Sequence, residues 1–357
     1  MVANTLSFMA AERIGDKIWC SNLNFNGLFA IDVHTWKAEY IGRFVGHETK
    51  SIGLHNIVRR CEDFLIFFSL YSGSIDTYNF SGDFSSCRLN TWLKKTHKKI
   101  YPGVAGIYQW GELIYVFPQF QGMSIIKYSP KHGTVVDETE LKGDHRSVDK
   151  NERLAFHTIG LEGYVFIPIF GTNTVIKYDM ENDTEEKLML EGVKQITGTI
   201  DTDGVSIWIC VDNSIMRFDS AMRKVLGTYP MIPCGKGFYA RFVFHENMVY
   251  VLPDRLGAIE VIDMSQNRVW SVPVDTNGLQ LWYGAISQWR HIENCICLEK
   301  EFMINPIGLK CALMVNFETL AVSRRRLKAP IDGIPDRIEY ENRKSLLEDY
   351  INFVKGL

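Results

Sequence analysis

The chain has 357 residues, of which 46% are hydrophobic, 12% aromatic and 23% charged, and its formal net charge is -3. This composition supports a packed core and excludes a disordered or fibrous chain. The weak net charge creates no overall field for nucleic acid or an anionic membrane, and no window approaches the roughly 18 consecutive apolar residues of a membrane span.

The first segment, from Met1 to Lys17, lacks a basic start followed by the apolar run of about 7–15 residues that a secretory signal needs. We therefore expect a cytoplasmic protein that binds neither nucleic acid nor membranes. The eight cysteines are too sparse for a disulfide framework. Four of them lie inside apolar strand runs and are expected to be buried free thiols: Cys20, Cys210, Cys295 and Cys297.

A hydrophobic residue followed by a short polar one recurs seven times, each time just before an expected turn. The pairs are Ile31-Asp32, Tyr78-Asn79, Tyr128-Ser129, Tyr178-Asp179, Phe218-Asp219, Ile262-Asp263 and Val315-Asn316. Their spacing of 47, 50, 50, 40, 44 and 53 residues, read from these positions, is typical of a solenoid or propeller. The side-chain oxygen can accept a hydrogen bond from the backbone two residues further on, which closes a tight turn into the next strand.

Each repeat is predicted to contain four strands. The second strands are short β-branched and aromatic runs, at 17–20, 64–67, 113–116, 164–167, 206–209, 248–251 and 294–297. Fourth strands are expected at 38–44, 87–93, 134–141, 185–190, 224–229, 268–274 and 320–327, and first strands precede each unit, for example at 54–59, 155–160 and 239–244. Seven such units without long helical patterns between them predict an all-β fold, a seven-bladed β-propeller of four-stranded antiparallel blades over residues 1–330.

The hydrophobic-Asp turn after the third strand resembles the repeats of the kelch, NHL and streptogramin-lyase-like propellers, over about residues 6–327. The sequence contains neither the double glycine of kelch repeats nor the Trp-Asp pair of WD40 repeats.

Blade 1 has four strands of its own, so the ring is expected to close by packing. An apolar stripe of helical period over Pro335 to Gly356 predicts a C-terminal α-helix, within an extension at 331–357 that packs on the propeller.

The loops around a propeller tunnel are where function concentrates. His47 and Glu48 lie between blades 1 and 2, His55 enters the first strand of blade 2, and His157 and Arg241 hold similar places in blades 4 and 6. We expect these side chains to converge at the tunnel mouth. A histidine beside a carboxylate can act as a general acid or base, and two histidines with Glu48 could instead hold a divalent metal. They could also be inert polar groups in a water-filled tunnel.

Other residues near the rim could bind a ligand. Asp254 and Arg255 could clamp a polar group or form only a surface ion pair. Lys94 and Lys95 begin the most basic stretch, which could attract an anion or remain a solvated loop. Aromatic side chains at the rim could stack on a sugar or peptide, or pack between blades: Phe120, Phe170, Tyr239, Trp282 and Tyr283.

The sequence has no P-loop, dinucleotide glycine fingerprint, HExxH or GxSxG motif. The leading hypothesis is a non-catalytic recognition module, without a certain cofactor, that binds a peptide, protein segment or anionic glycan at the tunnel mouth. The resemblance implies the alternative, a metal-assisted lyase or hydrolase with His55 and His157 as base or ligands and Glu48 as their partner. Convergence of these three side chains would favour catalysis, and separate hydrogen bonds to neighbouring strands would favour binding. A scaffold that dimerises through the C-terminal helix is the third hypothesis.

Overall fold

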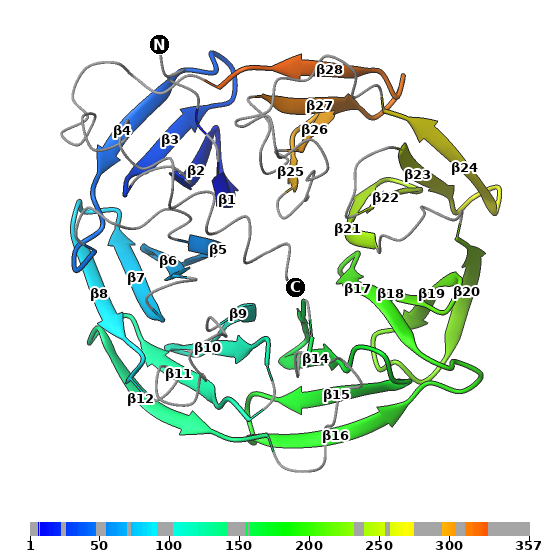
Figure 1. The fold of residues 1–357 in the computed structure, drawn as a ribbon, viewed down its shortest axis with the longest axis horizontal. Helices are drawn as coiled ribbons and strands as arrows, with labels where there is room; N and C mark the ends of the chain where they lie inside the picture. Colours follow the sequence, from blue (N-terminus) through cyan, green and yellow to red (C-terminus); the bar gives the residue numbers. More distant parts are fainter. Residues whose placement is uncertain are drawn as a thin grey trace, which may run out of the picture.

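The computed structural model describes residues 6, 8–22, 26–47, 55–69, 73–90, 103–120, 122–141, 154–155, 157–231, 239–253, 258–274, 295–304 and 311–327. Its strands form seven antiparallel sheets of four strands each, arranged in a ring (Figure 1). Every sheet uses four strands that are consecutive in the sequence, and the first strand of each lies nearest the centre. The predicted seven-bladed β-propeller is confirmed.

The first four blades contain sixteen strands. Blade 1 is β1 (Phe8–Ile14), β2 (Lys17–Asn22), β3 (Leu28–Asp32) and β4 (Ala38–Gly42). Blade 2 is β5 (His55–Cys61), β6 (Phe64–Ser69), β7 (Ser74–Asn79) and β8 (Phe84–Arg88). Blade 3 is β9 (Val104–Trp110), β10 (Leu113–Pro118), β11 (Ile125–Ser129) and β12 (Thr134–Thr139). Blade 4 is β13 (Ile159–Leu161), β14 (Tyr164–Pro168), β15 (Thr174–Asp179) and β16 (Thr184–Met189).

Three further blades complete the ring. Blade 5 is β17 (Ile196–Thr202), β18 (Ser206–Val211), β19 (Ser214–Asp219) and β20 (Val225–Pro230). Blade 6 is β21 (Tyr239–His245), β22 (Met248–Pro253), β23 (Ala258–Asp263) and β24 (Arg268–Pro273). Blade 7 is β25 (Cys295–Cys297), β26 (Glu301–Ile304), β27 (Ala312–Asn316) and β28 (Val322–Arg325).

The turn after each third strand forms as its sequence predicts. In all seven blades the Asp, Asn or Ser side chain accepts a hydrogen bond from a following backbone N–H, for example Thr35 to Asp32 Oδ1 at 2.7 Å and Thr319 to Asn316 Oδ1 at 2.8 Å. One residue in each turn has positive φ: Trp36, Gly82, Gly133, Asp183, Met222, Asn267 and Leu320. The side-chain hydrogen bond stabilises a turn whose positive φ is unfavourable for most residues other than glycine.

The weak fourth strand of blade 2 begins three residues before its predicted place, at Phe84 instead of 87. The turn after Asn79 is short, because the Gly82 N–H bonds the Asn79 carbonyl at 2.8 Å and the Asn79 N–H bonds the Asp83 carbonyl at 2.8 Å. Gly82 takes a φ of 112°, which a side chain would resist. The fourth strand, β8, can therefore begin directly after Asp83.

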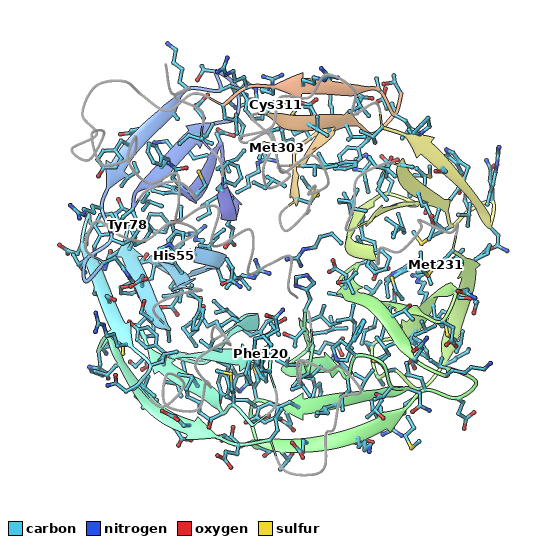
Figure 2. The ribbon with its side chains drawn as sticks, in the orientation of Figure 1. His55, Tyr78, Phe120, Met231, Met303 and Cys311 are labelled. Atoms are coloured by element: carbon cyan, nitrogen blue, oxygen red, sulfur yellow. The ribbon has the colours of Figure 1, made fainter. Side chains whose placement is uncertain are left out.

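Hydrophobic side chains fill the space between neighbouring blades (Figure 2). The described residues include a buried hydrophobic cluster at each of the seven interfaces. At the interface of blades 7 and 1 the cluster joins Phe8 to Met314, and the Leu6 N–H bonds the Leu327 carbonyl at 2.9 Å. Arg13 Nη1 also donates to the Cys297 carbonyl at 3.1 Å. The ring thus closes by packing and a few hydrogen bonds, without an exchanged strand, as predicted.

The cysteine expectation is only partly correct. Cys20 and Cys210 are buried, but Cys295 is half-buried and Cys297 is exposed. Cys297 is the last residue of the short inner strand β25 and lies just before the bend at residues 299–300. The predicted helix from Pro335 to Gly356 lies outside the described residues. Within the described residues, no helix has the length and apolar character that a membrane crossing requires.

Candidate functional site

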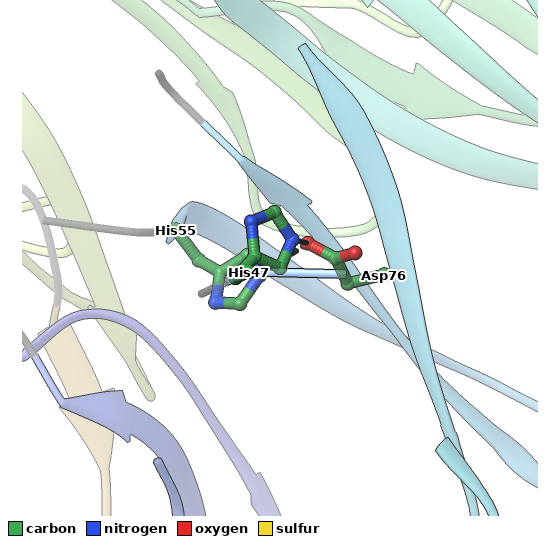
Figure 3. Close-up of side chains that lie close together, drawn as sticks. All are labelled: His47, His55 and Asp76. Carbon is green, nitrogen blue, oxygen red and sulfur yellow. Dashed lines mark hydrogen bonds and ion pairs between the residues drawn. The ribbon is translucent and has the colours of Figure 1, made fainter. Parts of the chain in front are cut away.

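Two of the predicted site histidines meet a buried carboxylate between blades 1 and 2 (Figure 3). His47 Nε2 lies 2.7 Å from Asp76 Oδ2, and His55 Nε2 lies 2.8 Å from the same oxygen. His47 follows β4, His55 begins β5, and Asp76 lies in the middle of β7. The His47 side chain is 4% exposed, and the side chains of His55 and Asp76 are 0% exposed. The three side chains form one group that bulk water does not reach.

Two serines complete this buried cluster. Ser21 Oγ lies 2.7 Å from His55 Nδ1, and Ser74 Oγ lies 3.1 Å from Asp76 Oδ2 and 3.2 Å from His47 Nε2. Burial lowers the pKa of His55 more than the hydrogen bond and charge of Asp76 raise it. The neutral ring therefore donates its Nε2–H to Asp76 and accepts the Ser21 hydroxyl at Nδ1.

Asp76 is ionised in this cluster. Burial alone would raise the pKa of its carboxyl, but the hydrogen bonds from His47 and His55 outweigh burial, and the pKa is lowered. Both imidazole rings approach Oδ2. The second oxygen, Oδ1, is buried and has no hydrogen-bond partner among the described residues.

Asn26 fixes the position of His47. Its Nδ2 donates to the Phe44 carbonyl at 2.8 Å and to the His47 carbonyl at 2.9 Å, and its Oδ1 accepts the Phe44 N–H at 3.0 Å. The Phe44 ring in turn packs against the His55 ring with centroids 4.3 Å apart. A loop residue of blade 1 therefore holds the chain that delivers His47 to blade 2.

Sequence reasoning selected His47 and His55 but missed Asp76 and Asn26. A signal for Asp76 exists in the repeat, three residues before the turn residue Asn79. In five of the other six blades this place is apolar: Phe29, Ile126, Ile176, Met216 and Leu313, with Glu260 in blade 6. A carboxylate in a strand position that is otherwise apolar marks a buried polar site.

A second group of polar residues belongs to the inner strands and the residues that lead into them. His157 precedes β13, Asp201 lies on β17 and Arg241 on β21, all half-buried, and Arg59 on β5 is exposed. Burial lowers the pKa of His157, and the positive charges of Arg241 and Arg59 lower it further. Burial raises the pKa of Asp201 against the opposing effect of the same two arginines. Because the same two arginines act on His157 and on Asp201, these residues of four blades lie around one space, the tunnel.

The inner strands carry a surplus of positive charge. Among the described residues, the charged side chains of the seven inner strands are four arginines and two carboxylates: Arg13, Arg59, Arg60, Arg241, Glu12 and Asp201. Their formal charges sum to +2, whereas the net charge of the whole chain is -3. The Glu12 carboxylate accepts the Arg60 backbone N–H at 2.7 Å, and Asp201 accepts the backbone N–H of Phe242 in the next blade. The carboxylates thus join neighbouring blades. Arg13 and Arg60 bond the carbonyls of Gly15 and Glu62 in the hairpins that follow them, so the arginines that act on His157 and Asp201 are Arg59 and Arg241.

The two predicted catalytic histidines, His55 and His157, have different surroundings. His55 bonds Asp76 and Ser21, whereas His157 is under the influence of the tunnel arginines. Phe120 is 5% exposed and packs in the cluster between blades 2 and 3, which is the alternative of packing between blades. Phe170 is half-buried in the turn after β14. The remaining candidates lie outside the described residues: Glu48, Lys94, Lys95, Asp254, Arg255, Trp282, Tyr283 and the side chain of Tyr239.

No family model and no curated protein matches this sequence. Among solved structures, a streptogramin B lyase matches with a TM-score of 0.61 and 13% identity over 87% of this chain and 93% of that chain. Sqt1 of Saccharomyces cerevisiae matches with a TM-score of 0.60 and 9% identity over 94% of both chains. The virginiamycin B lyase of Staphylococcus aureus matches with a TM-score of 0.59 and 12% identity over 85% of this chain and 93% of that chain. At these identities the likeness shows the fold: this chain shares the seven-bladed propeller of the streptogramin B lyase-like structures.

Proposed function

We propose that this protein is a non-catalytic recognition module that binds a carboxylate-bearing ligand, an acidic peptide segment or acidic glycan, at its tunnel. The observation that carries the proposal is the position of Arg59 on β5 and Arg241 on β21, where both arginines act on His157 and Asp201. Two arginines beside one carboxylate give this part of the tunnel a positive charge, which attracts anions.

Arginine suits this task because its planar guanidinium binds a carboxylate through two parallel hydrogen bonds. The hydrogen bond of Arg59 to the Val58 carbonyl, at 3.1 Å, uses one nitrogen and leaves an exposed side chain with further N–H donors. Neutral His157 adds one donor and one acceptor beside the arginines. Asp201 can accept a hydrogen bond from a hydroxyl or amine of the same ligand. The site therefore orients a molecule that carries a carboxylate together with a hydroxyl or an amine.

The same geometry argues against acid-base catalysis in the tunnel. The lowered pKa of His157 leaves its ring unprotonated at neutral pH and makes it a weak base. The lyase or hydrolase hypothesis needs His55 beside His157, but His55 is engaged in the buried cluster with Asp76. Binding therefore has the better support.

Fluorescence anisotropy with two labelled probes, hexaglutamate and a galacturonate oligosaccharide, tests the proposal. We expect at least one probe to bind the wild type, and Arg59→Gln and Arg241→Gln each to weaken binding roughly tenfold or more, because each removes a charged hydrogen-bond donor. Arg223→Gln is the matched control, since exposed Arg223 pairs with Glu186 at 2.8 Å outside the tunnel. Failure of both probes to bind, or equal affinity in all variants, would overturn the proposal.

A further inference from the structure

We propose that His47, His55 and Asp76 form a binding site for one divalent metal ion of the zinc class, buried between blades 1 and 2. One ligand atom from each of the three side chains lies within 4.8 Å of the others. Among the described residues, this is the group of histidine, cysteine and carboxylate side chains that is close enough to share an ion. The site is separate from the tunnel group and does not depend on the proposed function.

The three side chains supply a suitable donor set. Two imidazole nitrogens and one carboxylate oxygen are ligands that zinc accepts, with bonds of about 2.0–2.2 Å. Both rings already present Nε2 to the same carboxylate, at 2.7 and 2.8 Å. In a tetrahedral site with such bonds the ligand atoms lie about 3.3–3.5 Å apart. Small rotations of the three side chains would open that space.

A second observation points to a cation. Asp76 Oδ1 is buried without a hydrogen-bond partner among the described residues. A purely hydrogen-bonded role for the cluster leaves this oxygen unsatisfied, which is costly inside a protein. A metal ion that the carboxylate binds through both oxygens would also engage the oxygen that now lacks a partner, and Ser74 Oγ, 3.1 Å from Oδ2, is placed to contribute a further oxygen.

The surrounding hydrogen bonds permit the exchange of protons that coordination needs. When Nε2 of His55 binds the metal, the proton of the neutral ring resides on Nδ1, which then donates to Ser21 Oγ at its present distance of 2.7 Å. A bond of this kind from the remote ring nitrogen orients most metal-bound histidines. The His55 ring keeps one proton throughout, so its metal–nitrogen bond forms without net proton release or redox change.

The ion would join the connection after β4 to two strands of blade 2, because Asn26 holds His47 while His55 and Asp76 belong to β5 and β7. The burial of all three ligands favours a structural role over a catalytic one, since a catalytic ion keeps an open position for substrate.

Cobalt(II) titration of the full chain, after treatment with a chelator, tests the site through the visible absorption of tetrahedral cobalt. We expect one ion per chain in the wild type and binding roughly a hundredfold weaker or more in His47→Gln, because a glutamine amide can keep the hydrogen bond to Asp76 but is a poor metal ligand. His34→Gln is the matched control, since exposed His34 lies 3.4 Å from Asp16 and offers only a two-residue site. His157→Gln separately tests for an ion in the tunnel. Both controls are expected to bind like the wild type.

X-ray absorption of the zinc-loaded wild type gives a result that needs no variant. Two imidazole rings and oxygen in the zinc coordination sphere are expected, together with a melting temperature that zinc raises in the wild type and not in His47→Gln. Absence of stoichiometric binding in the wild type, sulfur among the ligands, or unchanged affinity in His47→Gln would overturn the site and leave a hydrogen-bonded cluster.

Discussion

His157 is held neutral by the protein around it and by two nearby guanidinium groups, and this arrangement has a consequence for stability. Its pKa lies well below that of a free histidine, which is about 6.5. Below about pH 6.5 the unfolded chain therefore takes up a proton at this residue that the native chain does not. Because the unfolded state then binds more protons, stability falls as the pH falls.

We expect the free energy of unfolding to fall between about pH 7.5 and 5.5, with this single residue contributing up to about 1.4 kcal/mol per pH unit below 6.5. His157→Gln removes that contribution and should give a shallower dependence in urea denaturation at each pH. The control is His132→Gln, at an exposed turn between β11 and β12, which should keep the wild-type slope. Parallel slopes for wild type and His157→Gln would show that the tunnel does not hold this ring neutral.

At the residue scale, sequence reasoning found only part of each candidate site. His47 and His55 were recognisable by residue type. Their carboxylate partner, Asp76, lies 21 residues after His55 on another strand, and only the folding of blade 2 brings it beside the two rings. Arg59 and Asp201 escaped for a related reason. They lie within inner strands that the sequence indicates by their apolar pattern. Only the arrangement of the blades in a ring places these strands around one tunnel.

At the scale of elements, the turns divide into two kinds. The turn after each third strand was predictable, because a local hydrogen bond from one side chain determines it. The hairpins between first and second strands differ from blade to blade in the residue that takes positive φ. Gly15 and Gly111 adopt positive φ in blades 1 and 3, but Glu62, Glu162 and Glu246 do so in blades 2, 4 and 6.

Glu246→Gly is expected to stabilise the protein by about 0.5–1 kcal/mol. A φ of 51° costs an L-residue about 1–2 kcal/mol, part of which is offset because glycine gives the unfolded chain more freedom. Thermal or urea unfolding measures the difference. Glu185→Gly within β16 serves as the control and should destabilise, since glycine weakens a strand. A loss of stability in Glu246→Gly would mean that the glutamate side chain has a role beyond the turn.

At the scale of the whole molecule, the ring depends on the interface where the two ends of the described chain meet. The number of blades and closure by packing followed from the repeat, since seven complete units leave no strand to exchange. Which side chains meet across each interface could not be predicted, because that depends on the tilt and level of neighbouring sheets. Met314 lies at this closing interface, is 0% exposed and packs with Phe8.

Met314→Ala should cost about 2–5 kcal/mol of unfolding free energy, because it leaves a cavity where blades 7 and 1 meet. Met189→Ala is the matched control, since that side chain is 66% exposed and its loss should change stability by less than about 0.5 kcal/mol. Urea denaturation of both variants gives the comparison. Equal and small effects would show that packing at this interface does not hold the ring closed.

The measurement that tests tunnel binding most directly is nitrogen NMR of the histidine rings, with resonances assigned through His157→Gln, during titration with hexaglutamate and then with the galacturonate oligosaccharide. We predict that the His157 signal shifts in a saturable way with at least one probe, and that Arg241→Gln weakens this response, because the carboxylate would bind beside both residues. A probe that binds while the His157 signal stays unchanged would place the ligand elsewhere and contradict the proposal.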